Sequence, residues 1–575
     1  MTSRTPPPSP FPHPALGWPL LLPAVFGMLI SLLLPTIQTI AFSFESGGLL
    51  EPTEFVGTAN YGRVLGAGEA FWPALGFTLS ITIVPLLVAL VAGPLVALAL
   101  DRAGTWVRRA GRVALSLAIV VFSPAAVAVS WLRGLRADAD GLVVTAAALG
   151  DPATAPGTFR LIVAATTFGV VCALAVLAFL PALRGGTVTG AMLVVAGLVT
   201  LATVAAGLQT FTTSLVLTRG GPVDSTMTPA LLQYTLVFQS ARLGLGATVA
   251  TVSGAILGVL GLAATVLVVA SGTRLSLIPR TATGQDSAPG RLYGSQEFGS
   301  GGPPGKRPAI RRPSAAGVAV GVLALAAFCA LTLVWAWPWL SALVASDGGT
   351  RPPTGPRVHL NTWVPALLGA LVSVGVAYLG ALGIGGLRPL GRHSEWLLLA
   401  FAPWLFVGSA PLSVARWNTL RGIGLLDTFV ALIPPVLVSV PALFVLTLLC
   451  RGLARRAGRD FLGGVVLPSL PMAGLAVVAV TLLNAQDLLW PLLVAQHQEL
   501  ATAPVTLMLQ VGEYDALSVE TGLSTPLIAM VLALAAAVAA QLRYLDRLVV
   551  TVGRDTGSSA TVGRGTGSRV PAPPA

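Results

Sequence analysis

Charged residues are scarce in this chain. They make up 10% of its 575 residues, and Lys306 is its single lysine. Soluble globular domains ordinarily contain about 25% charged residues. Hydrophobic residues reach 54% and the mean hydropathy is +0.83. The composition therefore excludes an ordinary soluble protein and predicts a protein that lies in a bilayer.

Cysteine and histidine are also rare. The three cysteines, Cys172, Cys329 and Cys450, fall inside predicted helices and form no C-x-x-C pair, so they are interpreted as small apolar packing residues. The four histidines are scattered over loops and termini. We therefore expect no metal site and no bound cofactor.

Catalytic motifs are missing as well. The chain has no Walker P-loop, no nucleophile elbow and no cluster of metal ligands. We therefore expect no catalytic residues and no enzymatic activity, and the chain cannot hydrolyse ATP by itself.

Long apolar runs are abundant instead. A membrane-spanning helix needs roughly 20 mostly apolar residues, and twelve runs are long enough. They lie at about 16–42, 73–100, 113–134, 160–182, 189–216, 244–271, 315–342, 362–386, 395–414, 427–450, 461–484 and 523–545. The sequence predicts an all-α integral membrane protein with about 12 transmembrane helices.

The helices divide into two groups of six, separated by a segment rich in Gly, Ser and Pro. We expect a disordered N-terminus, a first six-helix half, a disordered linker, a second six-helix half and a disordered C-terminal tail. These are residues 1–15, 16–272, 273–313, 314–550 and 551–575.

Most of the 34 basic residues fall in alternate loops, and most of the 22 acidic residues fall in the others. Because cytoplasmic loops are enriched in Lys and Arg, this bias predicts cytoplasmic N and C termini and a cytoplasmic linker. The formal charge of +12 is then a signal of topology, and no nucleic-acid partner is expected. The Arg, Gly and Pro bias suggests a high-GC bacterium, which predicts the bacterial plasma membrane.

Several polar segments of the first half occur in a specific order. Residues 55–61 read F-x-G-x-x-N-Y, residues 71–79 read F-W-x-A-x-x-x-T-L, and a T-x-G-G-P-x-x-S-T segment follows at 218–226. This ordered set resembles the permease subunits of binding-protein-dependent ABC importers of sugars and related solutes. The signature segment contributes Thr218, Gly220, Gly221, Pro222, Ser225 and Thr226.

The second half resembles the partner permease more faintly. Residues 424–428 are similar to the family's G-L-x-N/D-T, and residues 541–547 to its Q-R-Y-x-x-R. Residues 485–493 are similar to W-N-D/E-F-L-W-P-L, except that Ala485 replaces Trp and Gln486 replaces Asn. The chain thus looks like two permease subunits fused into one.

The resemblance implies the fold of a type I ABC importer permease. It also implies a set of partners: separate ABC ATPase subunits, an extracytoplasmic solute-binding protein, a small solute, in this family a carbohydrate, and membrane lipid. In the family the Gly-Gly-Pro loop faces the outside, near the docking surface of the binding protein. The alternative is a plain external turn, because Gly and Pro suit any tight loop.

Polar residues recur near the ends of the fifth and eleventh spans. Polar groups at membrane depth are costly unless they face a cavity or a partner, so these positions are candidates for a translocation path. The alternative is that they cap helix ends at the outer interface. The candidates are Gln209, Thr210, Thr212, Asn484, Gln486 and Asp487.

One family feature is missing. The resemblance implies a cytoplasmic loop of roughly 20 residues with a Glu-Ala-Ala core, which docks on the ATPase, but both corresponding loops here are short and contain no such core. A helix of about six residues is marginal by itself. The remaining candidates for ATPase contact are Arg184, Arg451, Arg455, Arg456, Arg459 and Asp460.

Three interpretations stay open. The first is a fused importer permease with reduced coupling loops. The second is a degenerate permease that serves as a membrane scaffold or regulator. The third is a 12-helix secondary transporter, although ionisable residues for proton coupling are nearly absent from the predicted spans.

Overall fold

The structure is a computed structural model. It describes residues 12–48, 54–136, 147–184, 188–278, 314–344, 356–458, 460–513 and 527–553. This part of the chain is almost entirely helical, and its only strands form two short two-stranded ribbons.

The first half contains the helices η1 (Pro14–Leu16), α1 (Gly17–Met28), η2 (Leu29–Leu33), α2 (Leu34–Ser43), α3 (Ala59–Leu65), α4 (Phe71–Leu87), η3 (Val88–Ala92), α5 (Gly93–Arg102), α6 (Thr105–Val121), α7 (Pro124–Arg136), α9 (Ala155–Ala182), α10 (Val188–Leu208), α11 (Thr212–Leu217), α12 (Pro229–Tyr234), η4 (Thr235–Gln239) and α13 (Leu243–Ala270). Its strands are β1 (Glu45–Ser46), β2 (Glu54–Phe55) and β3 (Arg274–Leu277).

The second half contains the helices α14 (Ala315–Val344), α15 (Pro356–Ala381), η5 (Leu382–Leu387), η6 (Gly391–Ala400), η7 (Ala402–Trp404), α16 (Ala410–Gly422), η8 (Phe429–Leu432), α17 (Val440–Ala454), η9 (Leu462–Val466), α18 (Leu467–Ala485), α19 (Leu489–Val494), η10 (Gln498–Leu500), α20 (Ala503–Glu513), α21 (Leu527–Arg543) and η13 (Leu545–Arg547). Its strand is β4 (Leu548–Thr551).

Nine helices in the described ranges are long and apolar enough to span a membrane. The expected span at 113–134 is a pair, α6 and α7, bent by 72°. The expected spans at 395–414 and 427–450 are not single helices. The first consists of 3₁₀ turns and the start of α16, and the second consists of η8, an irregular stretch and the shorter apolar helix α17. The multi-pass helical architecture is thus present, with fewer unbroken spans than the twelve expected.

Proline explains much of this difference. Pro403 and Pro411 interrupt the first of these segments, and Pro434, Pro435 and Pro441 interrupt the second. Hydropathy measures only how apolar a run is, whereas a proline removes a backbone donor and clashes with the preceding turn.

Milder proline effects occur inside the long helices. The π-helical segments η2, η3 and η9 each end two residues before a proline, namely Pro35, Pro94 and Pro468. A π turn is a wider turn, and it lets the helix continue past the missing donor.

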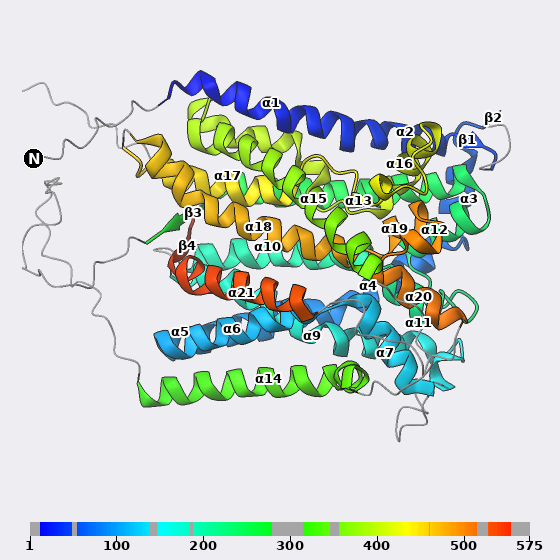
Figure 1. The fold of residues 1–575 in the computed structure, drawn as a ribbon, viewed down its shortest axis with the longest axis horizontal. Coiled ribbons are helices and arrows are strands. Elements are labelled where there is room, and N and C mark those ends of the chain that lie inside the picture. The colour runs from blue at the N-terminus through cyan, green and yellow to red at the C-terminus, as the bar shows by residue number, and fades with distance from the viewer. Residues whose placement is uncertain are drawn as a thin grey trace, which may run out of the picture.

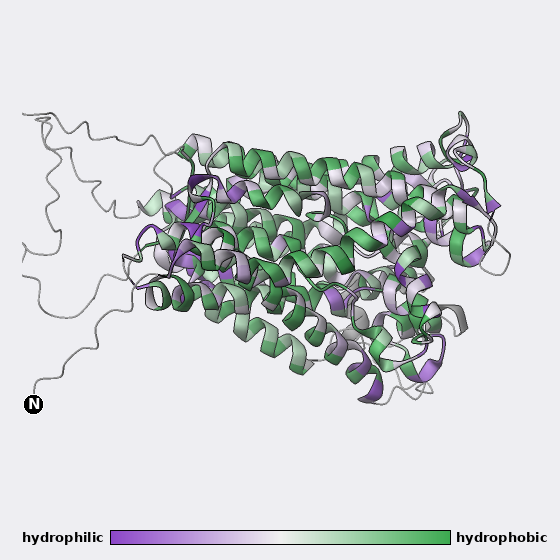
Figure 2. Cartoon of the chain, turned by 90° about the horizontal axis from the view of Figure 1, so that it is seen from above, coloured by the Kyte–Doolittle hydropathy of each residue, from purple (hydrophilic) through white to green (hydrophobic). Residues whose placement is uncertain are grey.

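The outer surface of the bundle is apolar along its length. Figure 2 shows hydrophobic residues covering the helices and hydrophilic residues gathered at the two ends. Hydroxyl side chains inside the helices donate back to the carbonyl four residues earlier, as Thr39 does to Pro35 and Thr78 does to Ala74. Such bonds satisfy polar groups where water is absent.

The two halves exchange their first long helices. Helix α1 of the first half packs on α15 and η5 of the second, and α14 of the second half packs on α5, α6, α7 and α9 of the first. Figure 1 shows α1 and α2 along one side of the bundle and α14 along the other. The last helices are exchanged too, because α13 packs on η6, η7 and α16, and α21 packs on α6.

Strands β3 and β4 join the ends of the two halves in an antiparallel ribbon that pairs Arg274 with Thr551 and Leu277 with Leu548. Strand β3 lies on α17 of the second half, and β4 lies on α9 of the first. The expected disordered linker at 273–313 therefore begins with ordered residues. We call the end of the bundle with this ribbon the ribbon end, and the end with β1, β2 and α3 the loop end (Figure 1).

Cutting the linker should leave the two halves associated. Because each half packs its first and last helices on the other, separating them would expose large apolar surfaces. We expect both fragments to co-purify after a protease site is inserted near Gly301 and cleaved. Affinity capture of one tagged fragment followed by size-exclusion chromatography in detergent measures this. Release of the untagged fragment would contradict the exchanged arrangement.

Candidate functional site

The fifth long helix of each half breaks in the same way. Helix α10 ends at Leu208, three residues follow, and the six-residue helix α11 begins at Thr212. Helix α18 ends at Ala485, three residues follow, and the six-residue helix α19 begins at Leu489. The two breaks place Gln209 and Gln486 at equivalent positions.

Gln209 binds the other half of the chain. Its amide nitrogen donates to the carbonyl of Phe406 at 2.8 Å, and its amide oxygen accepts from the backbone N–H of Gly408 at 2.6 Å. Both backbone groups lie in the irregular stretch that precedes α16. A side chain from the first half therefore satisfies a break in the second.

Gln486 makes the converse contact. The hydroxyl of Ser123 donates to its side-chain oxygen at 2.7 Å, and Ser123 lies in the bend between α6 and α7. In each half, the glutamine at the break of the fifth helix thus binds the third expected span of the other half, which is itself bent or broken. We call the contact region of Ser123, Gln209, Gly408, Ser409, Gln486 and Asp487 the break junction.

Asp487 brings a carboxylate to the same place. It accepts a hydrogen bond from the backbone N–H of Leu489 at 3.1 Å and another from the hydroxyl of Ser409. The guanidinium of Arg416, from α16, interacts with it electrostatically. Arg416 is almost fully buried and also donates to the carbonyl of Ser31 at 2.8 Å. The junction therefore brings polar groups of both halves together, and Gly408 is exposed at it.

The other predicted path residues are less central. The side chain of Asn484 donates to the carbonyl of Ala366 within its own half. The carbonyl of Thr210 accepts from the hydroxyl of Thr228, and Thr212 opens α11. Of the six predicted positions, Gln209, Gln486 and Asp487 come together across the halves.

The Gly-Gly-Pro segment folds tightly on α11. The hydroxyls of Thr218 and Thr226 are 2.7 Å apart, and Thr226 also donates to the carbonyl of Gly221 at 2.8 Å. The hydroxyl of Ser214 donates to the carbonyl of Thr226, which is fully buried. Gly220 has a φ of +85°, a conformation that glycine adopts without strain.

Signature residues such as Thr218 and Thr226 therefore form the hydrogen bonds that hold the loop together, while other residues form its exposed tip. Val223 is 86% exposed, and its neighbours Arg219 and Asp224 are also exposed. Pro222 and Ser225 flank this tip and are partly buried. A partner that reached this loop would first meet the tip residues, which the motif leaves unspecified.

In the second half, the segment that follows α19 corresponds to the Gly-Gly-Pro segment, and Asp427 binds it. Its carboxylate accepts hydrogen bonds from the backbone N–H groups of Gln496 and His497. Burial alone would raise the pKa of Asp427, but these two N–H groups and the His497 ring hold that pKa below its usual range. The segment of the first half is thus held by bonds within it and to α11, whereas that of the second half is held by Asp427 from 69 and 70 positions earlier in the chain.

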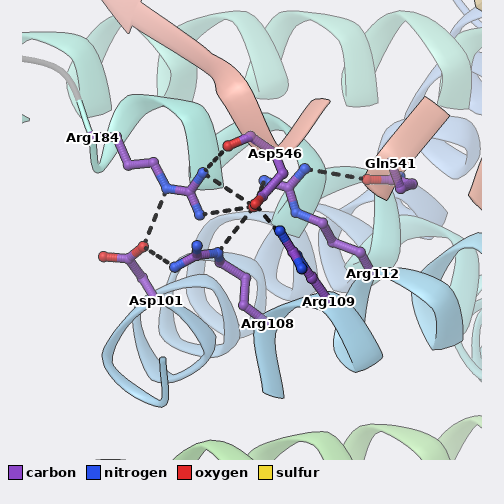
Figure 3. Close-up of polar contacts among 7 residues, drawn as sticks. All are labelled: Asp101, Arg108, Arg109, Arg112, Arg184, Gln541 and Asp546. Carbon is purple, nitrogen blue, oxygen red and sulfur yellow. Dashed lines mark hydrogen bonds and ion pairs between the residues drawn. The ribbon is translucent and has the colours of Figure 1, made fainter. Parts of the chain in front are cut away.

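The ribbon end contains a cluster of arginines around one carboxylate (Figure 3). Asp546, from the end of the second half, lies within 4 Å of four arginines of the first half. These contacts are with Arg108 at 3.2 Å, Arg184 at 3.4 Å, and Arg109 and Arg112 at 3.8 Å. Asp101 also pairs with Arg108 and Arg184. We call this group the Asp546 cluster.

A related arrangement ties the first half to the second. Arg451 pairs with the buried Glu395 at 2.9 Å and donates to the carbonyl of Thr273, just before β3. Arg184 donates in the same way to the carbonyl of Asp546, just before β4. Each fourth helix thus holds the chain that leaves the last helix of the other half.

The predicted ATPase-contact residues divide into inward-facing and exposed side chains. Arg184 and Arg451 face inward and are paired, whereas Arg455, Arg456 and Asp460 are exposed. Arg456 donates to the carbonyl of Leu277 in β3. Arg459 lies outside the described residues.

Sequence reasoning missed Ser123 and the stretch from Phe406 to Ser409. A weak internal repeat could have identified them, because Ser123 precedes Trp131 by eight residues and Ser409 precedes Trp417 by eight residues. In both cases a proline follows the serine within two residues. Over the described ranges, no group of three or more His, Cys, Asp or Glu side chains is placed to hold a metal ion.

Comparisons of the chain with protein-family models and with curated proteins found no match.

Replacing Asp546 should destabilise the protein. Asp546→Asn would leave several partly buried arginines without their shared carboxylate, and breaking a buried pair typically costs about 3–5 kcal/mol. We expect the melting temperature in detergent to fall by at least about 5 °C. Asp460→Asn is the matched control, because that carboxylate is exposed and, among the described residues, its hydrogen bond is the local one from the N–H of Gly463. Equal melting temperatures for both variants would show that the Asp546 cluster adds no stability.

Proposed function

We propose that this chain is the membrane-spanning permease of a binding-protein-dependent ABC importer, with two permease halves in one polypeptide. It would form the path for a sugar or similar small solute in a bacterial plasma membrane. The proposal rests chiefly on the break junction. Discontinuous helices at the interface of two halves are typical of substrate sites in secondary transporters, so the junction supports a transport path. The importer family is proposed from the resemblance of segments such as 218–226.

The physical reason lies in the backbone. Irregular chain at membrane depth is tolerated only where protein or a water-filled cavity satisfies its polar groups. At the junction Gln209 bonds two backbone groups of the break in the second half, and Gln486 accepts the hydroxyl of Ser123 in the bend of the first half. A relative movement of the halves would exchange these bonds for bonds to water or solute, which supports a role as a gate.

The two ends fit different partners. The ribbon end contains the Asp546 cluster and the exposed Arg455 and Arg456. By the positive-inside rule we assign this end to the cytoplasm, where separate ATPase subunits would bind. The loop end would then face outward and present the tip at Val223 to a solute-binding protein.

Two alternatives remain distinct. A scaffold or regulator would need the stable packing of the two halves on each other, but the break junction would not have to open. A secondary transporter would need an ionisable group on the path, and Asp487, which lies at the junction and interacts electrostatically with Arg416, supports this alternative.

Affinity purification of the full chain from its native membrane, followed by identification of the proteins bound to it, tests the proposal first. We expect an ATPase subunit to co-purify and solute uptake by the reconstituted complex to require ATP. Uptake driven by a pH gradient without ATP would indicate the secondary transporter. A folded, abundant chain with neither property would indicate the scaffold.

Neutralising Asp487 should impair transport without unfolding the chain. Asp487→Asn retains an oxygen that can accept the N–H of Leu489 but removes the charge facing Arg416. Hydrogen bonds to charged groups contribute about 1.5–3 kcal/mol, so we expect the uptake rate to change by about tenfold or more. Asp151→Asn is the control, because Asp151 accepts an equivalent bond from Ala153 at an exposed site. Unchanged uptake in Asp487→Asn would remove Asp487 from the path.

A further inference from the structure

A groove of about 460 Å³ lies between α18 and α21 of the second half. Its walls are apolar, with Gly474 and Val478 on one side and Ala536 and Ala540 on the other. These small side chains leave the groove open, and a methyl group added at Gly474 would meet no atom within 4 Å.

The groove faces the medium that surrounds the bundle. Both of its helices belong to candidate membrane spans. Large apolar side chains nearby are exposed, including Leu470 at 52%, Val531 at 55% and Leu532 at 66%. If these helices span a bilayer, the groove is filled by hydrocarbon and not by water.

One end of the groove is cationic. Arg543 and Arg547 line it where α21 approaches the ribbon end. Arg543 is exposed and makes no hydrogen bond or ion pair with any residue that the structure describes. Arg547 donates through Nε to the carbonyl of Ile278 at 2.8 Å.

No carboxylate balances this charge from within the groove. The described residues that line it include no acid. Asp546 is the nearest acid in sequence, and it is engaged by the four arginines of the Asp546 cluster on the first half (Figure 3). The groove therefore combines a hydrocarbon-sized space with one uncompensated positive end.

We propose that this groove binds an anionic phospholipid, with an acyl chain between α18 and α21 and the phosphate against Arg543 and Arg547. Guanidinium groups match phosphate oxygens in charge and geometry. Basic pockets between membrane helices at their cytoplasmic ends suit anionic headgroups. The assignment does not depend on the proposed transport function.

Native mass spectrometry of the purified, delipidated full-length chain tests the proposal. The probes are phosphatidylglycerol and phosphatidylcholine with identical acyl chains. A basic residue near the membrane surface contributes about 1 kcal/mol toward anionic lipid, or about fivefold in affinity. We expect the wild-type chain to bind its first phosphatidylglycerol at least about tenfold more tightly than phosphatidylcholine.

Charge variants separate this site from general lipid adhesion. The double variant Arg543→Gln/Arg547→Gln should lose most of the preference for phosphatidylglycerol. The control variant Arg102→Gln should retain the preference for phosphatidylglycerol. Arg102 is also exposed at the end of a membrane helix, but it does not line the groove. An equal preference in the double variant and the wild type would overturn the proposal.

The apolar part of the site needs its own variant. Ala540→Phe should fill the groove and weaken binding of the first lipid of either type by about tenfold, while an unchanged melting temperature shows that the chain is folded. Inorganic phosphate serves as the last probe. If phosphate alone competes as well as the whole lipid, the site is an anion site and the lipid assignment is wrong.

Discussion

Backbone groups left without partners by broken helices are the constraint on which this structure depends. The carbonyl of Phe406 and the N–H of Gly408 lie where a continuous helix would have paired them internally. Gln209 satisfies both groups from the other half of the chain. Where water is excluded, an unpaired backbone group costs several kcal/mol, so at membrane depth the two bonds from Gln209 would stabilise this break in the second half.

Two further sets of contacts join the halves: one at the break junction and one at the ribbon end. Ser123 in the bend of the first half reaches Gln486 of the second, and the arginines Arg184 and Arg451 hold the carbonyls of Asp546 and Thr273 across the halves. Each connection has a counterpart with the roles of the halves exchanged. Such paired contacts let a shift of one half be matched by a shift of the other, which is what the proposed gate requires.

The ribbon end is less symmetric than the break junction. The Asp546 cluster places four arginines on one carboxylate, whereas among the described residues Glu395 pairs with Arg388 and Arg451. The cationic groove at Arg543 likewise belongs to the second half. Partners that bind at the ribbon end, whether a lipid or an ATPase, would therefore distinguish the two halves even though their fifth helices break alike.

The helical, multi-pass character was predictable, because hydropathy depends on side chains alone and the long apolar runs become long helices. The broken segments were not. The run at 395–414 is apolar enough to be expected as a span, and whether Pro403 and Pro411 bend or end a helix there depends on the tertiary contacts around it. In the structure Gln209, 197 positions before Phe406 in the chain, binds the carbonyl of Phe406 and the N–H of Gly408.

The features of the candidate site likewise divide into those that the sequence determined and those that the tertiary structure decided. The sequence by itself determined which polar residues stand near the ends of the fifth and eleventh helices, since their chemistry is unusual in apolar surroundings. It determined neither that Gln209, Gln486 and Asp487 meet at one junction nor that Thr218 and Thr226 face inward while Val223 faces outward. Tertiary structure decided these points, because a side chain's partner in a bilayer is set by which helices pack together and not by its neighbours along the chain.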